Sequence, residues 1–178
     1  MARRGWALGV ALPVALAVWG CGDDGPTGPG LTLEAVAGVY DPTELTFDPQ
    51  GSPPPGDVLA QIQATQPQLV ISVTGGFQIA FLDPVTGFIR TPGGIADPTA
   101  DGVRLAFNNQ ADADLLLLPR TLVLTFHEDT GTLTFSGSVS VPRSRLLSLF
   151  PDLYGSEAFQ DPTPGTLIVT FERRTMTS

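Results

Sequence analysis

Between residues 69 and 172, apolar and polar side chains alternate in one short segment after another. The alternating segments are 69–74, 77–81, 103–107, 122–127, 132–141 and 166–172. Because successive side chains of a strand point to opposite faces of a sheet, a period of two is typical of half-buried β-strands. Gly75 and Gly76 separate the first two segments, and residues 128–131 separate the fourth from the fifth. Both connections predict β-hairpins.

An earlier strand is expected over residues 34–47, with a bend near Asp41 and Pro42. The chain then contains about seven to nine short strands with turn signals between them, which favours an all-β fold. Strands that follow each other in sequence usually pair in space, and closing such a sheet removes its exposed edges. We therefore predict an antiparallel up-and-down β-barrel, with a two-sheet β-sandwich as the alternative.

Evidence for helices is confined to one or two short stretches. Residues 56–63 could form one or two turns with Asp57 as the N-terminal cap. Residues 143–154 could form another helix, which Pro151 would interrupt. The run 112–118 fits either a buried strand or a turn of helix.

Residues 1–20 have the layout of a secretory signal peptide. Arg3 and Arg4 precede a mostly apolar run over residues 6–19. That run is shorter than the roughly 20 apolar residues that a membrane-spanning helix needs, and Pro13 lies within it. The sequence therefore predicts an exported protein.

The end of this leader resembles the lipobox of bacterial lipoproteins, because Val18, Gly20 and Cys21 match its pattern. Trp19 departs from it, since small residues are commoner there. The resemblance implies cleavage before Cys21 and a diacylglyceryl thioether on its sulfur, which is the only thiol in the chain. Gly22 after the cysteine implies delivery to the outer membrane, facing the periplasm or the cell surface. A buried cysteine in an uncleaved helix and cleavage by ordinary signal peptidase are the alternatives.

The mature chain divides into a tether and one domain. Residues 21–31 are rich in Gly, Pro and Asp and are expected to form a flexible tether, whereas residues 32–178 have the size of a single β-barrel domain. Without residues 1–20, seven arginines stand against 18 acidic residues, a net charge of −11. A domain of that charge is repelled by nucleic acid, so no nucleic-acid partner is expected.

The predicted barrel with its leader resembles lipocalin-like bacterial lipoproteins, on the residues Gly38-Val39-Tyr40 and Arg173-Arg174. Lipocalins begin with Gly-x-Trp and end with an arginine that stacks on the tryptophan. The resemblance implies that Tyr40 replaces the tryptophan and that Arg173 or Arg174 is the cation, a contact worth about 0.5–1 kcal/mol. No disulfide or second lipocalin motif accompanies it. An ordinary half-buried strand tyrosine is the alternative.

If the barrel is lipocalin-like, its inward-facing apolar residues are candidates for the wall of a site for one small apolar ligand. These candidates are Phe77, Ile79, Phe81, Leu105, Phe107, Leu124, Phe126 and Phe135. The alternative is that the same side chains fill the interior as packed core.

Catalytic and metal chemistry find little support. His127 is the only histidine and is expected to face solvent at a hairpin end, and the single cysteine is reserved for lipid, so we predict no zinc site and no cofactor. Asp112 and Asp114 would share a face if their segment were extended. The carboxylates of Asp97, Asp101 and Asp129 lie in predicted turns, where they are solvated or bind calcium weakly.

Two functions follow from these observations. The first is an envelope-anchored lipoprotein whose barrel binds a small apolar ligand. The second is a structural or protein-interaction module of the cell envelope with a packed barrel core. A carboxylate-based hydrolase is a third and weaker reading, since we expect no enzyme.

Overall fold

The computed structural model describes residues 30–175 except 52–53, 63–65 and 156. The predicted leader, Cys21 and most of the predicted tether lie outside the described residues. The strands are β1 (Gly38–Pro49), β2 (Gly56–Asp57), β3 (Gln68–Ile71), β4 (Gly76–Leu82), β5 (Ile89–Arg90), β6 (Gly93–Pro98), β7 (Gly102–Phe107), β8 (Thr121–His127), β9 (Thr132–Val141) and β10 (Thr163–Arg173). The helices are α1 (Leu33–Val36), α2 (Val58–Ile62), α3 (Gln110–Asp114), α4 (Arg143–Leu149) and α5 (Pro151–Tyr154).

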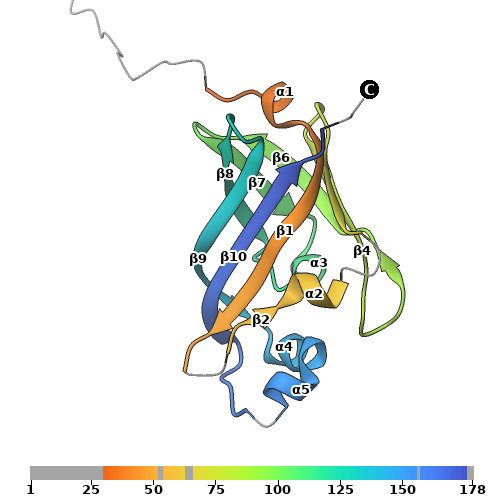
Figure 1. Cartoon of the computed structure of the whole chain (residues 1–178), viewed down its shortest axis with the longest axis vertical. Helices are drawn as coiled ribbons and strands as arrows, with labels where there is room; N and C mark the ends of the chain where they lie inside the picture. The colour runs from red at the N-terminus through yellow and green to blue at the C-terminus, as the bar shows by residue number, and fades with distance from the viewer. Residues whose placement is uncertain (1–29, 52–53, 63–65, 156, 176–178) are drawn as a thin grey trace, which may run out of the picture.

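The fold is a closed antiparallel β-barrel of eight strands, which confirms the predicted fold class (Figure 1). The strands β1, β3, β4, β6, β7, β8, β9 and β10 pair in that order, and β10 pairs with β1 to close the ring. The short strands β2 and β5 pair with β1 and β4 outside the ring. Closure of the ring excludes the sandwich alternative.

The closing pair, β1 with β10, runs from Tyr40 opposite Arg173 to Pro49 opposite Gly165. Its register shifts between Pro42 and Glu44, at the place where the sequence predicts a bend. Proline has no N–H to donate to the ladder, so a bulge is a natural place for it.

The first strand begins later than predicted, because residues 33–36 form helix α1 and β1 starts only at Gly38. The Thr32 side chain caps this helix by accepting a hydrogen bond from the Ala35 N–H at 3.4 Å. Glu34 in the first turn interacts favourably with the helix dipole. These local signals, missed in the alternation pattern, explain the difference.

The other helices lie close to where the sequence placed them. Asp57 caps α2 by accepting from the Ala60 N–H at 2.9 Å. Pro151 separates α4 from α5, and it is tolerated because it occupies the first turn of α5. The ambiguous run 112–118 is not a strand: α3 covers its beginning, and Asn109 caps that helix by accepting from the Asp112 N–H.

Buried apolar side chains form one continuous core inside the barrel. The inward side of each strand supplies it, as the burial pattern of β4, with every second residue buried, shows. The rings of Phe77 and Phe107 meet edge to face with their centroids 5.0 Å apart. None of the helices in the described part of the chain is both long and apolar enough to cross a membrane.

Candidate functional site: the barrel interior and its two ends

All eight candidate wall residues belong to the core or pack against it. Six are buried, with no more than 5 % of each side chain exposed. These six are Phe77, Ile79, Phe81, Leu105, Phe107 and Leu124. Phe126 and Phe135 are partly buried and pack against the same cluster. The period-two reading of their strands therefore placed these side chains correctly, whether or not they line a ligand site.

The interior of the barrel is occupied by these side chains. Five cavities outlined by the described residues are each lined by at most one of the eight candidates. The core cluster continues from the strands into the helices at the ends, through residues such as Val36, Leu146 and Tyr154. The buried side chains therefore form one continuous hydrophobic core that includes both ends of the barrel.

One end of the barrel is closed by α1 and by a cation between two aromatic rings. The guanidinium carbon of Arg173 lies 5.3 Å from the ring centroid of Tyr40 and 5.1 Å from that of Phe126. Arg173 also donates to the Tyr40 hydroxyl from Nη2 at 2.8 Å and from Nε at 3.2 Å. The predicted contact between Tyr40 and a C-terminal arginine is confirmed, and the cation is Arg173.

The same two side chains attach α1 to the barrel. The Tyr40 hydroxyl donates to the Val36 carbonyl at 2.7 Å, and Arg173 Nη2 donates to the Ala35 carbonyl. Burial raises the pKa of Tyr40, and the hydrogen bonds and charge of Arg173 oppose that rise in part. Tyr40 is thus a neutral donor at physiological pH, fixed between the helix and the arginine.

Arg174 points elsewhere. It forms a bidentate pair with Asp41, donating from Nε at 3.0 Å and from Nη2 at 2.5 Å. Both side chains are 42 % exposed, so the pair is a surface interaction of small energetic weight.

At the opposite end, a buried ion pair joins three separate parts of the chain. Arg145 on α4 donates to the Asp83 carboxylate at 2.9 Å, and the two side chains are 12 % and 1 % exposed. Arg145 also donates to the Leu115 carbonyl from Nη2 at 2.7 Å and from Nε at 3.1 Å. The arginine therefore holds α4 against the turn after β4 and the loop after α3. No local pattern pairs residues 62 positions apart, so the sequence analysis missed this contact.

Asp83 is ionised in this setting. Burial acts to raise its pKa, but hydrogen bonds from Arg145, Thr86 and Val85 outweigh burial and hold the pKa below its usual range. The Thr86 hydroxyl donates at 2.8 Å and the Val85 N–H at 3.2 Å.

Aromatic side chains complete the closure at this end. The ring of Tyr154 meets those of Phe150 and Phe159 edge to face, with centroids 5.4 Å away in each case. A Cβ added at Gly56 would lie only 2.9 Å from the Phe150 ring, so glycine permits this packing. The Tyr154 hydroxyl donates to the Pro54 carbonyl at 2.7 Å. Burial, assisted by the charge of Asp48, raises the pKa of Tyr154 to about 12.

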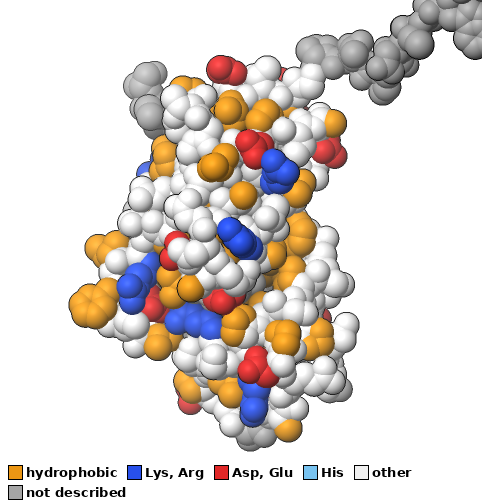
Figure 2. All heavy atoms as spheres, turned by 180° about the vertical axis from the view of Figure 1, so that it is seen from behind, with side chains coloured by type: hydrophobic (Ala, Val, Ile, Leu, Met, Phe, Trp, Pro, Cys, Tyr) orange, Lys and Arg blue, Asp and Glu red, His pale blue; other side chains and the backbone are white. Residues whose placement is uncertain are grey.

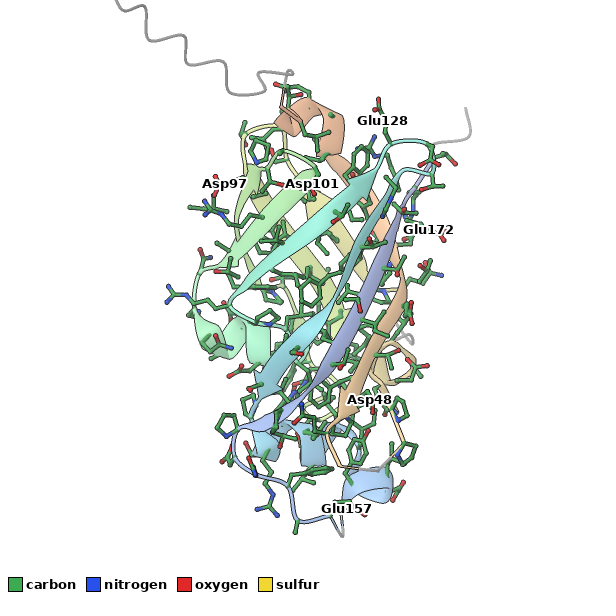
Figure 3. All side chains as sticks on the ribbon, turned by 90° about the vertical axis from the view of Figure 1, so that its left-hand side faces the viewer. Asp48, Asp97, Asp101, Glu128, Glu157 and Glu172 are labelled. Atoms are coloured by element: carbon green, nitrogen blue, oxygen red, sulfur yellow. The ribbon has the colours of Figure 1, made fainter. Side chains whose placement is uncertain are left out.

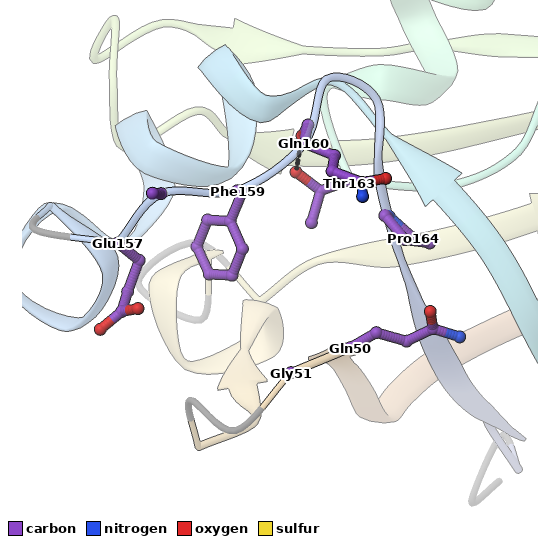
Figure 4. Close-up of a pocket in the computed structure, with 8 residues that line it drawn as sticks. Gln50, Gly51, Glu157, Phe159, Gln160, Thr163 and Pro164 are labelled. Atoms are coloured by element: carbon purple, nitrogen blue, oxygen red, sulfur yellow. Dashed lines mark hydrogen bonds between the residues drawn. The ribbon is translucent and has the colours of Figure 1, made fainter.

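A polar hollow of about 360 Å³ lies outside the core, beside α5 and the start of β10 (Figure 4). Gln50, Glu157, Phe159 and Gln160 are among its lining residues. The Thr163 hydroxyl donates to the Gln160 carbonyl at 2.8 Å, which fixes the rim. The described residues that line the hollow offer amide and carboxylate groups, and among them no nucleophile lies within hydrogen-bond reach of a base.

The remaining carboxylates are dispersed over the surface, as the labelled side chains of Figure 3 illustrate. Asp112 and Asp114 lie on helix α3 and so do not share a strand face; each accepts a side-chain amide hydrogen bond, from Asn109 and Gln110. Asp97 pairs with Arg104 at 2.7 Å, and the Thr99 hydroxyl donates to Asp101 at 3.5 Å. Within the described residues, no three acidic, histidine or cysteine side chains gather as a metal site would require.

His127 is exposed, as predicted, with its Nε2 2.9 Å from the Thr134 hydroxyl. No carboxylate accompanies it in that contact, so the geometry gives no catalytic dyad. No protein-family model, curated protein or solved structure matches this chain.

Proposed function

We propose that this protein is an envelope lipoprotein, anchored through Cys21, whose lipocalin-like barrel serves as a packed interaction module. The observation that carries this proposal is the filled interior. The eight side chains that could have lined a ligand cavity pack against one another as core, which leaves the outer surface for recognition. Obvious catalytic constellations are lacking among the described side chains, so a binding or structural role is favoured over an enzymatic one.

Both ends of the barrel are closed by side-chain contacts, which favours recognition at the outer surface over binding inside the barrel. Entry of a ligand at the α1 end would require separating Arg173 from Tyr40 and from the Ala35 carbonyl. Entry at the other end would require breaking the Arg145–Asp83 pair and exposing the Tyr154 aromatic cluster. A buried ion pair separated in this way leaves an uncompensated charge, at a cost of several kcal/mol.

The lipocalin-like assignment rests on the closed eight-stranded ring and on the contact between Tyr40 and Arg173. The first and last strands of the barrel supply these two residues, in register with each other. Their cation–π contact and hydrogen bonds perform the closing role that the resemblance implies for an arginine on a tryptophan. The anchor rests on the sequence around Cys21, and outer-membrane delivery rests on Gly22.

The anchor is tested by metabolic labelling with a palmitate analogue, followed by mass spectrometry of the N-terminal peptide. We expect the wild-type protein to begin at Cys21 and to carry a diacylglyceryl group, and we expect the Cys21→Ser variant to take up no label. A wild-type protein without label would refute the anchor.

The packed-core role is tested by native mass spectrometry of the mature protein purified from its own host. We expect the mass of the lipidated chain alone. A further lipid-sized mass, lost on denaturation, would instead support the second candidate, an apolar ligand within the barrel, and would count against the packed module.

A further inference from the structure

The sequence contains a long region with few charged residues in an otherwise acidic chain. Between Asp57 and Asp97, Asp83 and Arg90 are the only charged side chains. The mature chain as a whole has 18 acidic residues, so this region stands apart from its surroundings.

The fold gathers this region on one side of the barrel. Strands β3, β4 and β6 are neighbours in the ring, and β5 pairs with β4. Of the eight large hydrophobic side chains that are exposed in the described residues, six lie here. These six, Val70, Val73, Val85, Phe88, Ile89 and Ile95, define what we call the apolar face.

The most exposed part of the apolar face is the hairpin after β4, which projects from the side of the barrel (Figure 1). Phe88 is 67 % exposed and Ile89 is 72 % exposed. Seen from behind, hydrophobic side chains protrude at the edge of the molecule beside arginine side chains, which are blue (Figure 2). A projecting apolar tip of this kind is unusual on a soluble surface and indicates a contact.

Of the two charged side chains between Asp57 and Asp97, the cation is exposed and the carboxylate is buried. Asp83 is buried and paired with Arg145, so it does not reach the surface. Arg90 is 41 % exposed, with its Nε 4.0 Å from Asp83. At the edge of the face, Asp97 is neutralised by Arg104 at 2.7 Å.

We propose that the apolar face rests on a lipid bilayer, with Phe88 and Ile89 inserted at the level of the headgroups and Arg90 near the lipid phosphates. This inference rests on the proposed anchor at Cys21. The mature chain carries a net charge of −11, so most of the surface of the domain is repelled by anionic lipid. The side that bears the apolar face is the one that escapes this repulsion. Apolar insertion would add a second, weaker attachment to the lipid chains.

The length of the chain before the barrel permits this orientation. Cys21 and Gly30 are nine positions apart, and at about 3.3–3.6 Å per residue the chain between them reaches at most about 32 Å. Strand β4 begins near α1 and has seven residues, so its far end lies about 23 Å away at about 3.3 Å per residue. The reach of the tether therefore exceeds the length of β4, from the α1 end to the base of the hairpin, and the barrel can lie on its side.

The test uses tryptophan as a reporter, because both tryptophans, Trp6 and Trp19, precede Cys21. Phe88→Trp places the only tryptophan of the mature chain at the hairpin tip. The matched control is Val123→Trp on β8, where Val123 is 48 % exposed outside the apolar face. Each lipidated full-length protein is reconstituted into phosphatidylcholine vesicles with and without brominated acyl chains.

We expect the Phe88→Trp protein to emit at shorter wavelength in vesicles and to lose most of its fluorescence to brominated lipid, while the Val123→Trp protein changes little. Ile89→Ser in the Phe88→Trp background should abolish most of this quenching. Equal quenching at both sites, or none at residue 88, would overturn the inference. So would a shift of residue 88 that follows protein concentration or an added envelope protein without lipid, because the face would then bind a protein.

The two proposals fail separately. Mass spectrometry of the same samples reports whether Cys21 carries lipid, and quenching reports whether the apolar face contacts the bilayer. A lipidated protein without quenching at residue 88 would refute the bilayer contact of the apolar face and leave the proposed anchor at Cys21 standing. A chain without lipid on Cys21 overturns the anchor, and quenching by added vesicles then still supports the face.

Discussion

The ion pair between Arg145 and Asp83 should contribute far more to the free energy of unfolding than a surface pair of similar length. In the variant Arg145→Ala the Asp83 carboxylate, 1 % exposed, would lose its hydrogen-bonded cation at 2.9 Å and keep only Arg90, whose Nε lies 4.0 Å away. Removing one partner of a buried pair costs about 3–5 kcal/mol. Since domains of this kind have a free energy of unfolding of about 5–15 kcal/mol, the variant should lose a fifth or more of its stability.

Arg104→Ala is the matched control. Its pair with Asp97 is as short, at 2.7 Å against 2.9 Å, but the two side chains are 52 % and 43 % exposed. Such exposed pairs contribute about 0–1 kcal/mol. Because the two pairs are similarly short, the comparison separates the effect of burial on the free energy of unfolding from the effect of distance.

The assay is urea unfolding at neutral pH, followed by far-ultraviolet circular dichroism, with Asp83→Ala and the double variant completing a thermodynamic cycle. Removal of Arg145 should cost much less once Asp83 is absent, with a coupling energy of about 2–3 kcal/mol. A cost of less than about 1 kcal/mol for Arg145→Ala would refute the reasoning, because the pair would then behave like a surface pair.

The pH dependence supplies a second check. Because the folded-state pKa of Asp83 lies below its usual value of 3.8, the stability it contributes is present above that value and is lost as the pH falls through the folded pKa. Without Arg145, Asp83 is still buried and its pKa rises, so protonation of Asp83 in acid removes the buried negative charge that destabilises the variant. The stability gap between wild type and Arg145→Ala should narrow below about pH 4. A gap that stays constant in acid would contradict this account.

The two buried tyrosines give further predictions. Burial raises the pKa of Tyr154 from its usual value of 10.0 to about 12, so the stability that the neutral hydroxyl contributes is present below about pH 10 and is lost as the pH rises through about 12. The free energy of urea unfolding should therefore fall more over this pH range in the wild type than in Tyr154→Phe. Tyr40→Phe removes a donor to Val36 and an acceptor for Arg173, and should cost about 1–3 kcal/mol in urea unfolding at neutral pH. Equal stability of Tyr40→Phe and wild type would show that the hydroxyl is not needed to hold α1 in place.

The strands were predictable because their signal is local. Alternation along β4 and β8 reports which side chains turn inward, and the Gly75-Gly76 turn reports the hairpin, without reference to distant residues. Helix α1 was missed although its cap, Thr32, is equally local, because a pattern of period two drew the strand too far back. The contact between Tyr40 and an arginine was anticipated by resemblance, and the structure selected Arg173 over Arg174.

The sequence by itself therefore determined the class of fold and the inward face of the strands that show alternation, whereas β6 (Gly93–Pro98) was not predicted. The exported and lipid-anchored location stays a prediction. Only the tertiary structure decided that the ring closes between β1 and β10 and that the buried side chains form one continuous core. It also brought Arg145 to Asp83 and placed β3, β4 and β6, which carry few charged residues, side by side. The physical reason is that alternation constrains a residue's side of the sheet, whereas ring closure, cavity filling and buried ion pairs depend on contacts between segments far apart in the chain.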